Sequence, residues 1–173
     1  MVLDLIIEIP VVIAKLIAEY TAYRRDRRKE DDILVRRTLE REIGKAAEHI
    51  KNIMEQLYEK GQKAEIKKLK TVKDELDVFR SEINLSIVGH MYRFFSVQDV
   101  RSPKENDIKR LVDFDAQMCE RLVNVTVAMD AVETKVIDGE EVDLSREFLK
   151  IRQYITQIRN VYKERENFLR GWK

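Results

Sequence analysis

The sequence predicts an all-α protein, an up-down antiparallel helical bundle of four to five long helices. The first observation is composition: of 173 residues, 38% are charged and 44% hydrophobic, while only 5 are Gly and 2 are Pro. Sheets and irregular loops need many more turn-forming residues. The second observation is that apolar residues recur at alternating spacings of three and four, as in coiled coils. We therefore predict a single domain over residues 1–173, long enough to bury its own core.

The first predicted helix, over about residues 2–23, is unusually apolar. A helical projection gathers its charged side chains within an arc of roughly 60°; they are Asp4, Glu8, Lys15 and Glu19. These charges argue against a transmembrane span, and the segment lacks the basic start and cleavage site of a signal peptide. We expect a helix tucked against Ile83–Phe95 or exchanged between protomers. Peripheral membrane contact through residues 2–29 is the alternative.

Four longer helices are predicted from their heptad-like apolar seams, over about residues 32–60, 63–96, 103–138 and 144–170. Gly61 and Gly139 mark two helix ends, and Ser102-Pro103 marks a start, with Ser102 as the cap. Short connections between long helices make consecutive helices antiparallel neighbours. The sequence leaves open whether residues 24–32 form a turn or continue a helix.

Three polar residues interrupt the apolar seams: His90, Asp115 and Arg165. An antiparallel register for the last two helices places Asp115 beside Arg165. A similar register for the preceding pair places His90 within about one helical turn of the same level. Because an unpaired buried carboxylate is very costly, we expect a structural salt bridge at this core polar cluster. The alternative is a small polar pocket that holds an anion or a cofactor against Arg165 and His90.

The sequence carries no recognisable motif for catalysis, metal binding or phosphate binding. The two histidines are His49 and His90, and neither follows a Glu by three residues, as di-iron bundles require. The single cysteine, Cys119, excludes an internal disulfide and suits a reducing compartment, so we expect a cytoplasmic protein. We therefore expect no catalytic residues, no metal and no cofactor.

The strongest local charge feature is a basic segment between residues 24 and 37. Its members are Arg24, Arg25, Arg27, Arg28, Lys29, Arg36 and Arg37. Because 33 basic and 32 acidic side chains nearly balance, only such a local patch could attract nucleic acid or an anionic surface. Acidic residues follow directly, however, and make a solvated or ion-paired face the simpler interpretation.

These observations favour a non-enzymatic protein that acts through oligomerisation or protein-partner binding. The reason is an excess of apolar helix surface without any visible site chemistry. Two alternatives stay open: nucleic-acid or anionic-surface binding through Arg24 to Arg37, and a small-ligand bundle with a pocket at His90, Asp115 and Arg165. The abundance of Glu, Lys and Arg also suits a thermophilic source.

Overall fold

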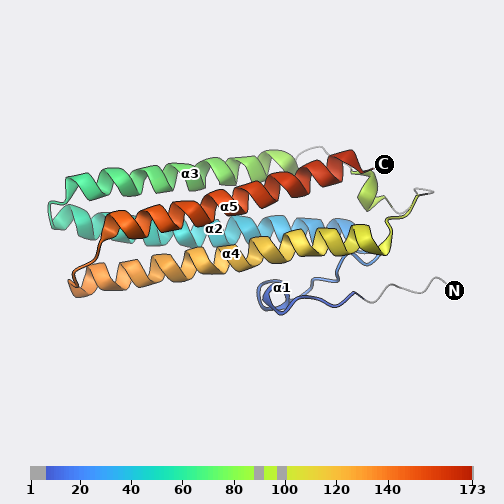
Figure 1. Cartoon of the computed structure of the whole chain (residues 1–173), viewed down its shortest axis with the longest axis horizontal. Helices are drawn as coiled ribbons and strands as arrows, with labels where there is room; N and C mark the ends of the chain where they lie inside the picture. The colour runs from blue at the N-terminus through green and yellow to red at the C-terminus, as the bar shows by residue number, and fades with distance from the viewer. Residues whose placement is uncertain (1–6, 88–91, 97–100, 173) are drawn as a thin grey trace.

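The computed structural model consists of four long helices that lie side by side, with a short helix against one flank (Figure 1). It describes residues 7–87, 92–96 and 101–172. The long helices are α2 (Arg28–Glu59), α3 (Lys63–Ile87), α4 (Glu105–Asp138) and α5 (Leu144–Gly171). The short elements are α1 (Val11–Leu16) and the 3-10 turn η1 (Arg93–Phe95). With no β-strand in these ranges, the predicted all-α helical bundle is confirmed.

The bundle is made of two antiparallel hairpins, α2–α3 and α4–α5 (Figure 1). Gly61 and Gly139 follow the first helix of each hairpin with φ of 69° and 73°, a left-handed conformation that favours glycine. The hairpins pack so that α2 lies beside α4 and α3 beside α5, each pair running in parallel. The ion pairs Glu75–Arg152 and Glu82–Arg159 join α3 to α5 at a constant sequence offset.

This arrangement corrects one expectation, because α3 and α4 are not antiparallel neighbours. Each of them packs instead against α2 and α5, so that α3 and α4 occupy diagonal corners of the bundle (Figure 1). The expectation holds within each hairpin, where the two helices are antiparallel and their apolar seams face inward. Every predicted seam position of α4 is buried: Ile108, Leu111, Asp115, Met118, Leu122, Val125, Met129, Val132 and Val136.

The predicted helix over residues 2–23 is wrong. Residues 1–6 lie outside the described part, and residues 7–27 form an irregular segment, here called the N-terminal strap, in which only α1 is helical. Pro10 has no amide hydrogen to donate, so it starts α1 and cannot continue a longer helix. Ala22 and Tyr23 then adopt positive φ of 53° and 59°, which no helix tolerates.

The strap also docks on a different surface from the one expected. α1 packs against α4, where Ile13 and Ile17 become buried, instead of against residues 83–95. Contact with that region comes from Tyr23, whose ring centroid lies 6.2 Å from Phe94 and 6.1 Å from Phe95. The strap thus buries Ile13, Ile17 and Tyr20, which had made the N-terminus look like a surface for a partner, and leaves Val11 exposed.

Several helix ends differ from the predicted ones. α2 begins at Arg28, so residues 24–27 form a turn and the rest of that charged region is helical. The helix expected over residues 63–96 does not reach its end, because Tyr92 is extended and residues 93–95 form η1. α4 begins at Glu105, two residues after the predicted start, and the Asp107 carboxylate accepts a hydrogen bond from the Lys104 amide at 2.9 Å. Among the described helices, none is both long and apolar enough to cross a membrane.

Candidate functional site

A buried ion pair between α4 and α5 interrupts the apolar core. Arg165 Nε lies 2.8 Å from Asp115 Oδ1, and both side chains are 0% exposed. The structure therefore places these two residues side by side, as the antiparallel register of α4 and α5 predicts. His90, the third residue expected in the cluster, lies outside the described residues.

Two tyrosines of the N-terminal strap complete the surroundings of Asp115. The hydroxyl groups of Tyr20 and Tyr23 donate to Asp115 Oδ2 at 2.9 Å and 2.5 Å. Arg165 Nη2 in turn donates to the Tyr23 hydroxyl at 2.7 Å. Since α4, α5 and the strap each contribute to these bonds, the pair fastens the strap to the bundle.

Asp31, at the start of α2, holds the backbone of the strap. Its carboxylate accepts from the amide of Tyr23 at 2.7 Å and from the amide and hydroxyl of Thr21 at 3.1 Å and 2.8 Å. These bonds fix the left-handed turn at Ala22 and Tyr23, a conformation that a non-glycine residue adopts only when its surroundings impose it. The same turn directs the Tyr23 ring toward Asp115.

The ion pair continues into a second set of buried charges on α2 and α5. Asp32 bridges the two arginines, with Oδ2 2.9 Å from Arg36 Nε and Oδ1 2.8 Å from Arg165 Nη2. Glu166 Oε1 lies 2.7 Å from Arg36 Nη2, and Tyr92 donates to Glu166 Oε2. We call the five charged residues the buried ionic network; they are Asp32, Arg36, Asp115, Arg165 and Glu166.

Neutral hydroxyl groups satisfy the remaining donors of the network. Arg36 Nη1 donates to the hydroxyls of Ser86 and Tyr162 at 2.5 Å and 2.6 Å. Those two hydroxyls also contact each other, and Ser86 donates to the Ile83 carbonyl. Arg36 thereby links α2 to both α3 and α5 at the level where the strap docks.

The network holds three carboxylates and two guanidinium groups. The pKa values of two of its carboxylates, Asp32 and Asp115, shift in opposite directions. Burial raises the pKa of Asp32, but the adjacent Arg165 and Arg36 outweigh it and hold that pKa below the ordinary value. Burial dominates at Asp115 and raises its pKa despite Arg165. Neither Asp115 nor Arg165 has exposed surface, so a solute cannot reach them. The geometry therefore favours a structural role over catalysis.

Stability is expected to fall in alkaline solution because of the buried tyrosines. Burial raises the pKa of Tyr20 and Tyr23 well above the ordinary value and that of Tyr162 to about 12. A pKa raised by folding contributes stability below the unfolded value, about 10, that is lost as pH rises through the folded pKa. The raised pKa of Tyr162 alone should lower the free energy of unfolding by about 2–3 kcal/mol by about pH 12.

Urea unfolding between about pH 8 and pH 12 tests this expectation. The free energy of unfolding should decline above about pH 10, and the decline should be shallower in Tyr162→Phe. A flat profile over that range would show that the phenols ionise as readily in the folded chain as in the unfolded one.

The predicted basic patch is not one continuous surface. Arg28 and Arg36 are 5% and 1% exposed, so they belong to the interior and must be removed from the patch. Arg36 is drawn inward by Asp32 and Glu166, and Arg28 donates to the Tyr23 carbonyl. The exposed members are Arg24, which pairs with Asp26, and Arg25, Lys29 and Arg37; Arg27 is half-buried. Binding of nucleic acid through this segment therefore loses support.

No metal site emerges from the described residues, where no three His, Cys, Asp or Glu side chains gather for an ion. His49, on α2, instead contacts Glu133 on α4, which also accepts from the Asn52 amide. Cys119 is buried, and burial raises its pKa to about 12, so that its thiol is a poor nucleophile.

Most of the network escaped sequence reasoning, although one signal was present. Arg36 lies seven residues before Ile43 and therefore on the same apolar seam of α2, and Asp32 precedes it by one turn. The strap tyrosines and Glu166 carried no comparable signal, because their positions depend on an irregular backbone and a neighbouring helix.

No known protein-family model matches the chain, and no curated protein or solved structure matches it either.

Proposed function

We propose that this protein is a non-enzymatic helical bundle that associates with a second copy of itself through the surface of α2 and α3. The observation that carries the proposal is an apolar groove of about 510 Å³ between the end of α2 and the start of α3. Met54, Tyr58 and Ile66 supply its apolar lining, and Tyr58 is 75% exposed. A large aromatic side chain at a helix groove is a common anchor of protein interfaces.

Charges around the groove favour a second copy as the occupant. Lys51, Glu55, Glu59 and Lys73 line it, so the same surface offers two positive and two negative side chains. In a two-fold dimer a patch meets itself, and its lysines can then lie opposite the glutamates of the other copy. The ion pair Lys51–Glu55 is long at 3.9 Å and exposed, which leaves both groups available, whereas Lys73 already pairs with Asp77 at 2.5 Å.

The chemistry of the interior supports a non-catalytic role. Asp115 and Arg165 have no exposed surface and are bonded to each other and to Tyr23, so neither offers a group to a substrate. A small-ligand pocket at Asp115 and Arg165 would require opening the core, and it is less well supported than surface association. The buried free thiol of Cys119 suits a reducing location such as the cytoplasm.

Tyr58→Glu is expected to weaken self-association at least tenfold. The substitution removes the exposed aromatic ring at the centre of the proposed interface and adds a third negative charge beside Glu55 and Glu59. Sedimentation velocity from about 1 to 100 μM measures the effect as a shift from dimer to monomer. Because Tyr58 is exposed, the variant should keep the wild-type melting temperature.

Val127→Glu provides the matched control, because Val127 is 63% exposed on α4, away from the groove. It should leave the dimer intact. A wild-type chain that stays monomeric throughout this range would overturn the proposal, and so would equal loss of dimer in both variants. A complex that requires a different protein chain would also count against self-association.

A further inference from the structure

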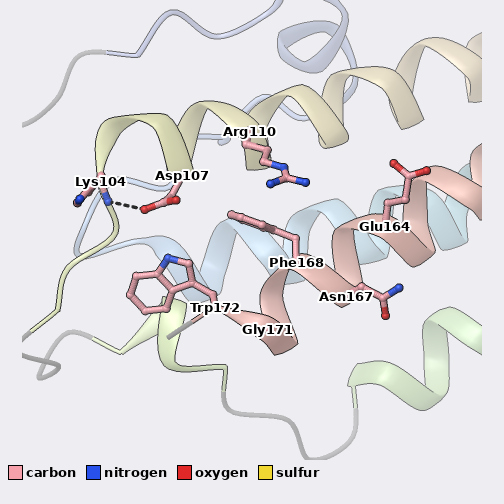
Figure 2. A pocket seen from close by; sticks show the side chains of 8 residues that line it. All are labelled: Lys104, Asp107, Arg110, Glu164, Asn167, Phe168, Gly171 and Trp172. Atoms are coloured by element: carbon pink, nitrogen blue, oxygen red, sulfur yellow. Dashed lines mark hydrogen bonds between the residues drawn. The ribbon is translucent and has the colours of Figure 1, made fainter.

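A second cavity lies at the other end of the bundle, between the first turns of α4 and the last turns of α5. It has a volume of about 810 Å³, within the range of small-molecule pockets. Figure 2 shows Arg110 on the α4 side facing Phe168 on α5, with Trp172 just beyond the end of α5 and with Asp107 between Arg110 and Lys104. The remaining lining residues are Glu164, Asn167 and Gly171.

Arg110 is held over the cavity by aromatic rings and not by a carboxylate. Its guanidinium carbon lies 5.0 Å from the centroid of Phe168 and 5.7 Å from that of Phe114. Among the described residues, its guanidinium takes part in no hydrogen bond or ion pair. Stacking engages the face of a guanidinium and leaves the N–H groups at its edge free to donate.

The aromatic side of the cavity is fixed by packing. Phe94 contacts both Phe168 and Trp172, with ring centroids 6.1 Å and 5.4 Å apart, and this holds the two rings beside each other. Phe168 and Trp172 are nevertheless only partly buried, so part of each remains available to a ligand. Two aromatic rings beside a guanidinium whose N–H groups are free to donate suit a flat ring that carries a negative charge.

Two carboxylates, those of Asp107 and Glu164, also line the cavity and offset its two cations. Asp107 accepts from the Lys104 amide at 2.9 Å, so it is committed to the start of α4 (Figure 2). Glu164 lies on α5 at the opposite side from Lys104 in the same view. Two cations and two carboxylates leave the lining without net charge, so the attraction for an anion comes from Arg110, whose guanidinium is held by aromatic rings.

We infer that this cavity binds a small anion that carries an aromatic ring, with Arg110 binding the anionic group and Phe168 and Trp172 contacting the ring. This site is independent of the proposed dimer, because it is formed by different helices at the opposite end of the bundle. The anionic group can be a carboxylate or a phosphate, since a guanidinium group binds both.

Trp172 makes the site directly observable, because it is the only tryptophan of the chain. Its fluorescence in the full-length protein should change saturably on titration with AMP or benzoate, two aromatic anions. Adenosine, which lacks the charge, and inorganic phosphate, which lacks the ring, should each bind at least tenfold more weakly. A preference for AMP or for benzoate then identifies phosphate or carboxylate as the favoured group.

Substitutions locate the binding. Arg110→Gln should weaken binding of the preferred anion at least fivefold, while Glu164→Gln should leave it unchanged or strengthen it. Lys109→Gln is the matched control, since Lys109 is an equally exposed cation on α4 that pairs with Glu105 and does not line the cavity. No saturable signal with either aromatic anion would overturn the inference, as would equal weakening in the Lys109 variant.

Discussion

Replacing Arg165 with methionine is expected to lower the free energy of unfolding by about 3–5 kcal/mol, the cost of removing one partner from a buried ion pair. Arg165 contacts three carboxylates, those of Asp32, Asp115 and Glu166, and it is 0% exposed. Arg36 still serves Asp32 and Glu166 in the variant. Asp115, by contrast, would keep only the two strap tyrosines, and no cation would remain beside its charge.

The loss should depend on pH in a direction that identifies Asp115 as the cause. Burial already raises the pKa of Asp115 with Arg165 present, and removing that cation must raise it further. A carboxyl group with a raised folded pKa destabilises when ionised and recovers as pH falls through that pKa. The deficit of Arg165→Met relative to wild type should therefore shrink between about pH 7 and pH 5 in urea unfolding.

Arg146→Met is the control for this substitution, because Arg146 is an exposed arginine on the same helix. Its free energy of unfolding should stay within about 0.5 kcal/mol of wild type at both pH values. An Arg165→Met protein as stable as the Arg146 variant would mean that the buried ionic network contributes nothing to folding.

Asp115→Ala is expected to cost more than about 2 kcal/mol. The substitution removes the acceptor shared by Tyr20 and Tyr23 and leaves both hydroxyls buried without that bond. Arg165 keeps Asp32 and Glu166, which is why the effect should be smaller than that of Arg165→Met. Chemical unfolding monitored by circular dichroism gives the free energy directly.

Asp113→Ala is the matched control for this change, since Asp113 is exposed on α4 only two residues away. It should change the free energy of unfolding by less than about 0.5 kcal/mol. In the double variant Asp115→Ala/Arg165→Met the losses should not add, because the two side chains form one pair. Full additivity would contradict direct coupling between them.

The regular part of this fold could be predicted from the sequence because its information is local and periodic. Seams such as Leu111, Met118 and Val125 repeat every seven residues, and a helix must bury such a stripe. The contact between Asp115 and Arg165 followed from the same regularity, since a tight turn at Gly139 sets the register of α4 and α5. Helix length and hairpin register are thus encoded by short-range patterns.

The N-terminal strap could not be predicted in this way. Its apolar composition suits a helix, but Pro10 interrupts it and Asp31 draws the backbone of Tyr23 into a left-handed turn. That turn depends on a hydrogen bond across eight residues, which leaves no periodic signal. The diagonal placement of α3 and α4 was not predicted for a similar reason: helices that are consecutive in sequence are often neighbours in space but need not be.

The strap also changes the functional interpretation of the N-terminus. Residues that resembled a docking surface, such as Ile13, Ile17 and Tyr20, are buried against the chain's own helices. Among the described residues, Tyr58 at the α2–α3 groove is the prominent exposed aromatic residue, whereas the strap leaves Val11 exposed. A firmly docked strap is a condition for this proposal, because a detached strap would expose a competing apolar surface.

Amide hydrogen exchange at Tyr23, measured by NMR on the full-length chain, tests this docking most directly. The Tyr23 amide donates to Asp31 at 2.7 Å, and its side chain is locked by Asp115 and Arg165. We expect a free energy of opening close to that of global unfolding, as for amides in the core of α4 and α5, and a marked fall in Asp115→Ala. Exchange at the rate of an unstructured peptide would contradict a fastened strap.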